Sequence, residues 1–137
     1  MANTLLQSDT QEINQSAETV FSFFSDFRNI EKILPEGKIE NFEASADHCS
    51  FYLVGISQLH LKIMEKTEFE KITYQSENNS YQIALEIHLK KIDTNRTYCH
   101  LEMSAEFPKI IKMMAEKPLK SVLNKMAEKI KDIQFPN

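Results

Sequence analysis

Apolar and polar residues alternate with a period of two through residues 38–107. This pattern is typical of half-buried antiparallel strands, whose alternate side chains face a core. We predict six strands that follow one another as a meander, with one boundary near residues 68–71. The Asn-Asn pair at 78–79 suits a two-residue hairpin loop, which sets Tyr74 opposite Ile83. The predicted inward rows contain Phe51, Leu53, Leu59, Leu61, Ile63, Ile72, Tyr74, Tyr81, Ile83, Leu85, Ile87, Leu89, Leu101, Met103, Ala105 and Phe107.

A helical period precedes this segment. Residues 5–14 read as a polar strand, after which Ser16 can cap a first helix. Four phenylalanines lie in residues 20–27 at helical spacing, so this helix has one strongly apolar side. A second short helix is predicted over residues 29–34, and Pro35 ends it.

A long helix is predicted at the end of the chain. Pro118 is unfavourable inside a helix but acceptable at its first position. We therefore predict a short helix or loop over residues 108–116 and a long helix over residues 118–133. The long helix has lysines on one side and, on the other, an apolar stripe that predicts one buried face: Leu119, Val122, Leu123, Met126, Ile130 and Ile133.

Length and composition narrow the class of protein. A chain of 137 residues fits one domain with one substantial core, so we predict a single domain over residues 1–137. The net charge of −4 argues against nucleic-acid binding, which requires clustered lysines and arginines to neutralise phosphates. The N-terminal sequence has no apolar block of signal-peptide length, and the two cysteines provide no disulfide framework. We therefore expect a cytoplasmic protein.

The charge is unevenly distributed along the chain. From residue 108 onward there are seven lysines and three acidic residues, a net charge of +4, which leaves −8 for residues 1–107. The favoured interpretation is the solvated side of an amphipathic helix. The alternative is a peripheral contact of these lysines with an anionic membrane or an acidic partner.

Histidines are the commonest metal ligands, and two of them are predicted to be neighbours. A three-residue loop at 93–95 sets His88 directly across from His100, with Glu86 and Glu102 beside the pair. Such a group can form a surface metal site. We favour plain solvated side chains, because neighbours on one sheet face rarely supply a closed tetrahedral shell. The prediction is therefore no metal and no other cofactor.

Nucleophilic and phosphate-binding motifs are absent from the sequence, which contains no G-x-S-x-G, H-E-x-x-H, C-x-x-C or Gly-rich phosphate loop. Cys49 and Cys99 fall in the inward register beside apolar residues. There a thiol is usually a small buried hydrophobe and not an activated nucleophile. We assign no catalytic residue.

Three stretches of the chain resemble one superfamily. Residues 13–35, INQSAETVFSFFSDFRNIEKILP, resemble its opening, in which a strand leads into a helix near A-x-x-V and continues to S-D and P. The stretches VGISQLHLKIMEK and EKPLKSVLNKMAEKIKDI resemble its mid-sheet strand and its closing helix. This is the START-like (SRPBCC) superfamily, and the chain is most similar to its polyketide cyclase/dehydrase-like members and its carbon monoxide dehydrogenase subunit-like members.

The resemblance implies the helix-grip fold of the α+β class. In this fold a curved antiparallel sheet of about seven strands wraps around a long C-terminal helix, and two short helices follow the first strand. An apolar cavity lies between sheet and helix, and the phenylalanines of residues 20–27 would close one end of it. The implied function is binding of a hydrophobic small molecule such as a lipid, a quinone or a polyketide-like compound, without catalysis. Two alternatives are a cyclase/dehydrase-type enzyme and a surface-acting assembly or accessory protein.

The expected cavity wall combines the inward rows of the sheet with the apolar stripe of the helix. Tyr74 and Tyr81 are polar members of the wall, and an inward phenol needs a partner from protein, water or ligand. Asp9 and Gln11 share a strand face with Ile13 and can also point inward. The predicted ligand-binding residues are Phe24, Phe51, Leu53, Leu61, Tyr74, Tyr81, Ile83, Leu85, Met103, Met114, Val122 and Met126.

Overall fold

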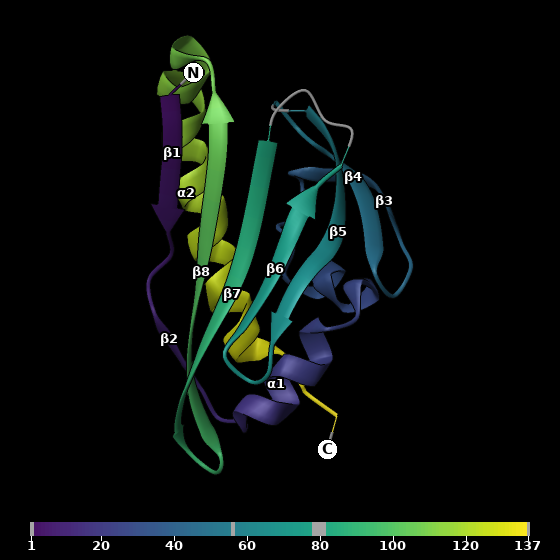
Figure 1. Ribbon diagram of the computed structural model, residues 1–137, viewed down its shortest axis with the longest axis vertical. Coiled ribbons are helices and arrows are strands. Elements are labelled where there is room, and N and C mark those ends of the chain that lie inside the picture. Colours follow the sequence, from purple (N-terminus) through teal and green to yellow (C-terminus); the bar gives the residue numbers. More distant parts are fainter. Residues whose placement is uncertain (1, 56, 78–81, 137) are drawn as a thin grey trace.

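The computed structural model describes residues 2–55, 57–77 and 82–136. Within these ranges eight strands form one antiparallel sheet in the order β1-β8-β7-β6-β5-β4-β3, and β2 pairs with β8 (Figure 1). The helices are α1 (Ala17–Phe24), the 3₁₀ helix η1 (Phe27–Ile33) and the long α2 (Lys109–Asp132). The strands are β1 (Ala2–Gln7), β2 (Gln11–Ile13), β3 (Ile39–Ala44), β4 (His48–Leu53), β5 (Ser57–Thr67), β6 (Lys71–Ser76), β7 (Gln82–Asp93) and β8 (Arg96–Phe107).

This architecture confirms the predicted helix-grip fold. The six consecutive strands β3 to β8 form the expected meander, and the boundary near residues 68–71 falls at the turn between β5 and β6. Helix α2 packs against β8, β1, β2 and η1, and it runs behind β1 and β8 in Figure 1. No helix in the described part of the chain is long and apolar enough to span a membrane.

The predicted N-terminal strand is divided in two, which gives one strand more than expected. Ser8 lies at the break and exchanges two hydrogen bonds with Leu101 of β8: its backbone N–H donates to the Leu101 carbonyl at 2.9 Å, and its Oγ accepts from the Leu101 N–H at 2.9 Å. Asp9 is exposed, and its N–H donates to Asn124 Oδ1 of α2 at 2.8 Å. The expectation that Asp9 points inward is therefore wrong.

The predicted register of β6 against β7 is wrong by two residues. Tyr74 lies opposite Leu85, and not opposite Ile83. The side chain of Ser76 accepts the N–H of Ile83 at 2.9 Å, so the paired backbone ladder ends early and the connection is longer than two residues. A shift of two residues keeps the same side chains on the inward face. The Asn-Asn pair at 78–79 lies outside the described residues.

The register of β7 against β8 is confirmed, because His88 lies directly opposite His100. A register shift between Lys91 and Asp93 then pairs Asp93 with Arg96. The loop consequently contains two residues and not the predicted three.

Helix α1 begins as predicted. The Oγ of Ser16 accepts the N–H of Thr19 at 3.1 Å, which satisfies one of the free donors at the helix start. Phe23 and Phe24 pack edge-to-face on each other and on Phe135 from the C-terminal tail, with ring centroids 5.0 to 6.3 Å apart. These aromatic contacts fix the end of the molecule at which α1 and the tail meet.

Helix α2 runs without interruption through Pro118, so the prediction of a separate element over residues 108–116 is wrong. Pro118 is exposed, and Met114, whose carbonyl would otherwise accept the missing N–H, is also exposed. The unsatisfied carbonyl therefore faces solvent. Ala115 and Leu119 on either side are buried, and their packing holds the helix across the proline.

Candidate functional site: an apolar cavity between sheet and helix

A small cavity of about 40 Å³ lies between the sheet and α2. Five strands contribute inward side chains to its wall, α2 contributes one face of two helical turns, and the η1 segment closes one side. Every lining residue is apolar: Ile30, Leu34, Ile39, Phe51, Leu53, Leu59, Leu61, Ile83, Leu85, Met103, Leu119, Val122, Leu123 and Met126.

The periods of the two element types explain how the wall forms. Strand residues two apart face the same side, so Phe51 and Leu53 of β4 and the corresponding pairs on β5 and β7 line up over the cavity. Helix residues three and four apart share a face, which brings Leu119, Val122 and Met126 together opposite the sheet.

Eight of the predicted ligand-binding residues line this cavity. The structure thus brings them together around one space, and their contact with a ligand stays a prediction. The eight are Phe51, Leu53, Leu61, Ile83, Leu85, Met103, Val122 and Met126.

Phe24, Tyr74 and Met114 do not line the cavity, and Tyr81 lies outside the described residues. Phe24 is fully buried in the aromatic cluster with Phe135. Met114 is 70% exposed, because the continuous helix turns Ala115 and not Met114 toward the core. The assignment of Met114 to the cavity wall is therefore wrong.

Tyr74 has a partner within the protein. Its hydroxyl donates to the backbone carbonyl of Phe24 at 2.6 Å, and its ring packs on Phe27 with centroids 4.4 Å apart. The Phe24 carbonyl is one of the four that the end of α1 leaves without a helical partner. Burial raises the pKa of this phenol well above its ordinary value, so Tyr74 stays neutral and acts as a donor.

Six lining residues are not among the predicted binding residues. Leu59, Leu119 and Leu123 belong to the predicted inward rows and apolar stripe, so the periodic pattern places them in the core. Ile30 and Leu34 belong to the η1 segment. Their position over the cavity depends on how η1 folds back on the sheet, which no local pattern records. Ile39 at the start of β3 completes the set.

The cavity approaches solvent on one side. Of the lining residues, Ile39 of β3 and Val122 of α2 are the two that are only partly buried. Near this side Lys129 Nζ donates to the backbone carbonyl of Leu34 at 3.0 Å, which joins α2 to the end of η1. A movement of α2 away from β3 and η1 would break this one hydrogen bond.

The volume limits what the cavity holds in this conformation. A space of about 40 Å³ has room for roughly three water molecules, and an apolar space of this size stays dry. Sites for drug-sized ligands measure roughly 300–1,000 Å³. A hydrophobic ligand therefore requires the wall to move. Met103 and Met126 are the flexible side chains of that wall and can change rotamer at low cost.

Thiol and metal chemistry lie away from this cavity. Burial raises the pKa of both Cys49 and Cys99 to about 12, so both thiols are protonated and unreactive near neutral pH. Among the described residues, one group of histidine and acidic side chains is close enough to hold a metal: His88, His100 and Glu102. It lies on the opposite face of the sheet, because the residues between them point toward α2.

Neither the known protein-family models nor the sequences of curated proteins match this chain. Solved structures match its fold. Norcoclaurine synthase from Thalictrum flavum in complex with dopamine and hydroxybenzaldehyde matches with a TM-score of 0.71 and 14% sequence identity, over 96% of this chain and 86% of that chain. A START superfamily protein from Mycobacterium smegmatis gives 0.67 and 15%, over 95% and 99%. A conserved protein from Geobacillus kaustophilus gives 0.68 and 17%, over 96% and 93%.

Proposed function

We propose, from the START-like (SRPBCC) fold that this chain has and from the apolar cavity within it, that the protein binds a hydrophobic small molecule. The observation that carries the proposal is the chemistry of the wall: all fourteen lining residues are apolar. Such a wall favours a lipid, quinone or polyketide-like compound over a charged metabolite, because a charge placed there would lose its hydration without a partner.

Binding energy would come from burial of the ligand's apolar surface. A ligand that buries about 300 Å² of such surface gains roughly 7 kcal/mol, from which the costs of immobilisation and of moving the wall are subtracted. The proposal therefore includes a widening of the cavity between Ile39 and Val122, where the wall is already partly open to solvent. Affinities in the micromolar range or weaker are expected for small probes.

The proposal also includes binding without covalent chemistry, in the cytoplasm. The two free buried cysteines support a reducing compartment. The alternative, a cyclase/dehydrase-type enzyme that uses the same cavity, is equally compatible with the norcoclaurine synthase likeness. It requires an acid–base pair in the cavity, and the described lining residues contain no titratable group.

Titration with N-phenyl-1-naphthylamine, an apolar fluorescent probe, tests this proposal. Val122→Trp fills the cavity from α2, and Ile110→Trp makes a comparable change at an exposed position of the same helix. We expect Val122→Trp to weaken probe binding at least about tenfold and Ile110→Trp to leave it unchanged, with the unfolding midpoint recorded for each. Equal affinities for both variants and the wild type would refute a site in this cavity.

A surface feature supports a second candidate function, peripheral docking on an anionic membrane. Ile110, Met113 and Met114 are neighbouring exposed apolar residues on the first turns of α2, with exposures of 72%, 75% and 70%. Lys109 and Lys117 flank them on the same helix. Apolar residues bordered by lysines match the interfacial region of a bilayer that contains anionic lipids.

Co-sedimentation with vesicles tests this second function. The triple variant Ile110→Ser, Met113→Ser and Met114→Ser should lose binding to vesicles that contain phosphatidylglycerol. The matched control, Met64→Ser, removes an apolar side chain that is 56% exposed on β5. Wild-type protein that stays in the supernatant with anionic vesicles would refute membrane docking and leave the cavity proposal unaffected.

A further inference from the structure

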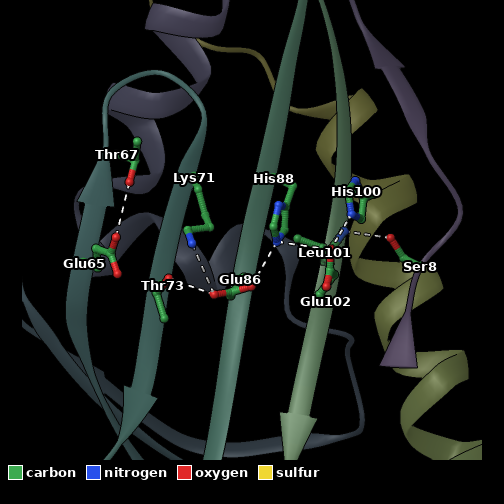
Figure 2. Close-up of polar contacts among 10 residues, drawn as sticks. All are labelled: Ser8, Glu65, Thr67, Lys71, Thr73, Glu86, His88, His100, Leu101 and Glu102. Carbon is green, nitrogen blue, oxygen red and sulfur yellow. Dashed lines mark hydrogen bonds and ion pairs between the residues drawn. The ribbon is translucent and has the colours of Figure 1, made fainter. Parts of the chain in front are cut away.

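The outer face of the sheet carries two cross-strand pairs of ionisable side chains next to each other. His88 of β7 lies directly opposite His100 of β8, and Glu86 lies directly opposite Glu102. The residues between them, such as Leu101, point to the opposite face and are buried under α2. Figure 2 shows the two imidazoles side by side with the carboxylates at one end of the pair. The ring centroids are 4.8 Å apart and the planes differ by 14°.

The nitrogen and oxygen atoms converge on one point. Glu102 Oε2 lies 2.9 Å from His100 Nε2 and 3.2 Å from His88 Nε2. One donor atom from each of the three residues lies within 4.8 Å of the other two. In tetrahedral zinc sites with metal–ligand bonds of about 2.0–2.1 Å, neighbouring donors are roughly 3.3 Å apart. The observed separations are close to that value before any side chain moves.

We propose that His88, His100 and Glu102 bind a divalent transition-metal ion, with Zn²⁺ as the expected occupant. Imidazole and carboxylate donors suit zinc, and two histidines with one glutamate leave a fourth position open. Glu86 lies beside this position, with its Oε1 3.0 Å from His88 Nε2. The site faces away from the apolar cavity, so its occupancy does not depend on the proposed ligand.

Surrounding contacts hold the ligands in place. Glu86 Oε2 accepts a hydrogen bond from Thr73 Oγ1 at 3.1 Å and lies 3.9 Å from Lys71 Nζ, which leaves Oε1 directed at His88 (Figure 2). Between His100 and Glu102, the N–H of Leu101 donates to Ser8 Oγ, which fixes the backbone of β8. Such outer contacts orient ligands and contribute to metal affinity.

The side chains also have an intermediate exposure. Those of Glu102, His88 and His100 are 19%, 27% and 30% exposed. They are therefore more restricted than fully exposed residues, yet an ion can reach them from solvent. This distinguishes the group from His48 and Asp47, whose side chains are 56% and 73% exposed.

Calorimetric titration of the full chain with ZnCl₂ in a non-coordinating buffer tests the site. We expect one ion per chain with a dissociation constant below about 10 μM, and a loss of at least about 100-fold in affinity for His100→Asn and for Glu102→Gln. The control, His48→Asn, removes an imidazole outside the group and should bind as the wild type does. Circular dichroism checks that each variant is folded.

Two results would overturn the proposal. The first is wild-type protein that binds Zn²⁺ more weakly than about 100 μM, which is typical of adventitious surface contacts and not of a built site. The second is binding that His48→Asn abolishes while His100→Asn retains it. Added Zn²⁺ should also raise the unfolding midpoint of the wild type and of His48→Asn, and should leave that of Glu102→Gln unchanged.

Discussion

Removal of the Tyr74 hydroxyl tests whether this buried phenol is structural or belongs to the ligand site. Tyr74→Phe keeps the ring on Phe27 and removes the donor that lies 2.6 Å from the Phe24 carbonyl. Both groups are fully buried, so water cannot replace the lost hydrogen bond. An unsatisfied buried carbonyl costs about 1–3 kcal/mol.

The expected change is large enough to measure. A chain of 137 residues has an unfolding entropy of roughly 0.29 kcal/mol/K near 60 °C, so a loss of about 2 kcal/mol lowers Tm by roughly 7 °C. Urea unfolding monitored by circular dichroism gives the free energy of unfolding, and an unchanged m-value shows that the surface exposed on unfolding is unchanged. Tyr98→Phe is the matched control, because Tyr98 is 43% exposed, and it should change stability by less than about 0.5 kcal/mol.

Two outcomes would refute this reasoning. A Tyr74→Phe protein as stable as the wild type would show that the hydroxyl contributes nothing to the attachment of α1. A stable Tyr74→Phe protein with reduced affinity for N-phenyl-1-naphthylamine would show that the hydroxyl faces the ligand. The structure predicts the reverse, a less stable protein whose probe affinity is unchanged while it remains folded.

Two further predictions concern the thiols and the contact between α2 and η1. Because burial raises the pKa of Cys49 and Cys99 to about 12, a disulfide reagent such as dithionitrobenzoate should react slowly with both thiols at pH 8, and rapidly after unfolding in urea. The same shifts make stability fall as the pH rises from about 9 toward 12, because thiols of the unfolded chain ionise there first; rapid labelling of native protein would contradict both statements. Lys129→Met removes the hydrogen bond to the Leu34 carbonyl and should speed association of the apolar probe in stopped-flow measurements, whereas exposed Lys125→Met should not. Equal association rates for the two variants would show that this contact does not restrain the cavity.

Most of the fold could be predicted because its strands show a clean period of two. Inward residues of β4, β5, β7 and β8 follow from alternation alone, and a register error of two residues at Tyr74 leaves every side chain on its predicted face. The break at Ser8 could not be predicted in this way. It depends on hydrogen bonds with Leu101, which lies far along the chain.

The candidate site is harder to predict, because it depends on distances between elements. The sequence pattern identifies eight lining residues, but it misassigns Met114, since Pro118 hides the continuity of α2 and therefore its helical phase. The partner of Tyr74 lies 50 residues away, on α1, which local patterns do not record. The cavity volume follows from how Met126 and its neighbours pack against the sheet, and no periodicity contains that information.

The central claim is that a hydrophobic molecule occupies the space between the sheet and α2. Native mass spectrometry of freshly purified wild-type protein and of Val122→Trp tests it most directly, with solvent extraction to identify any released compound. The account predicts one apolar adduct on the wild type, present at purification or formed with added fatty acids or quinones, and no adduct on Val122→Trp. A wild-type protein that keeps its unmodified mass with all of these compounds, or a Val122→Trp protein that carries the same adduct, would contradict it.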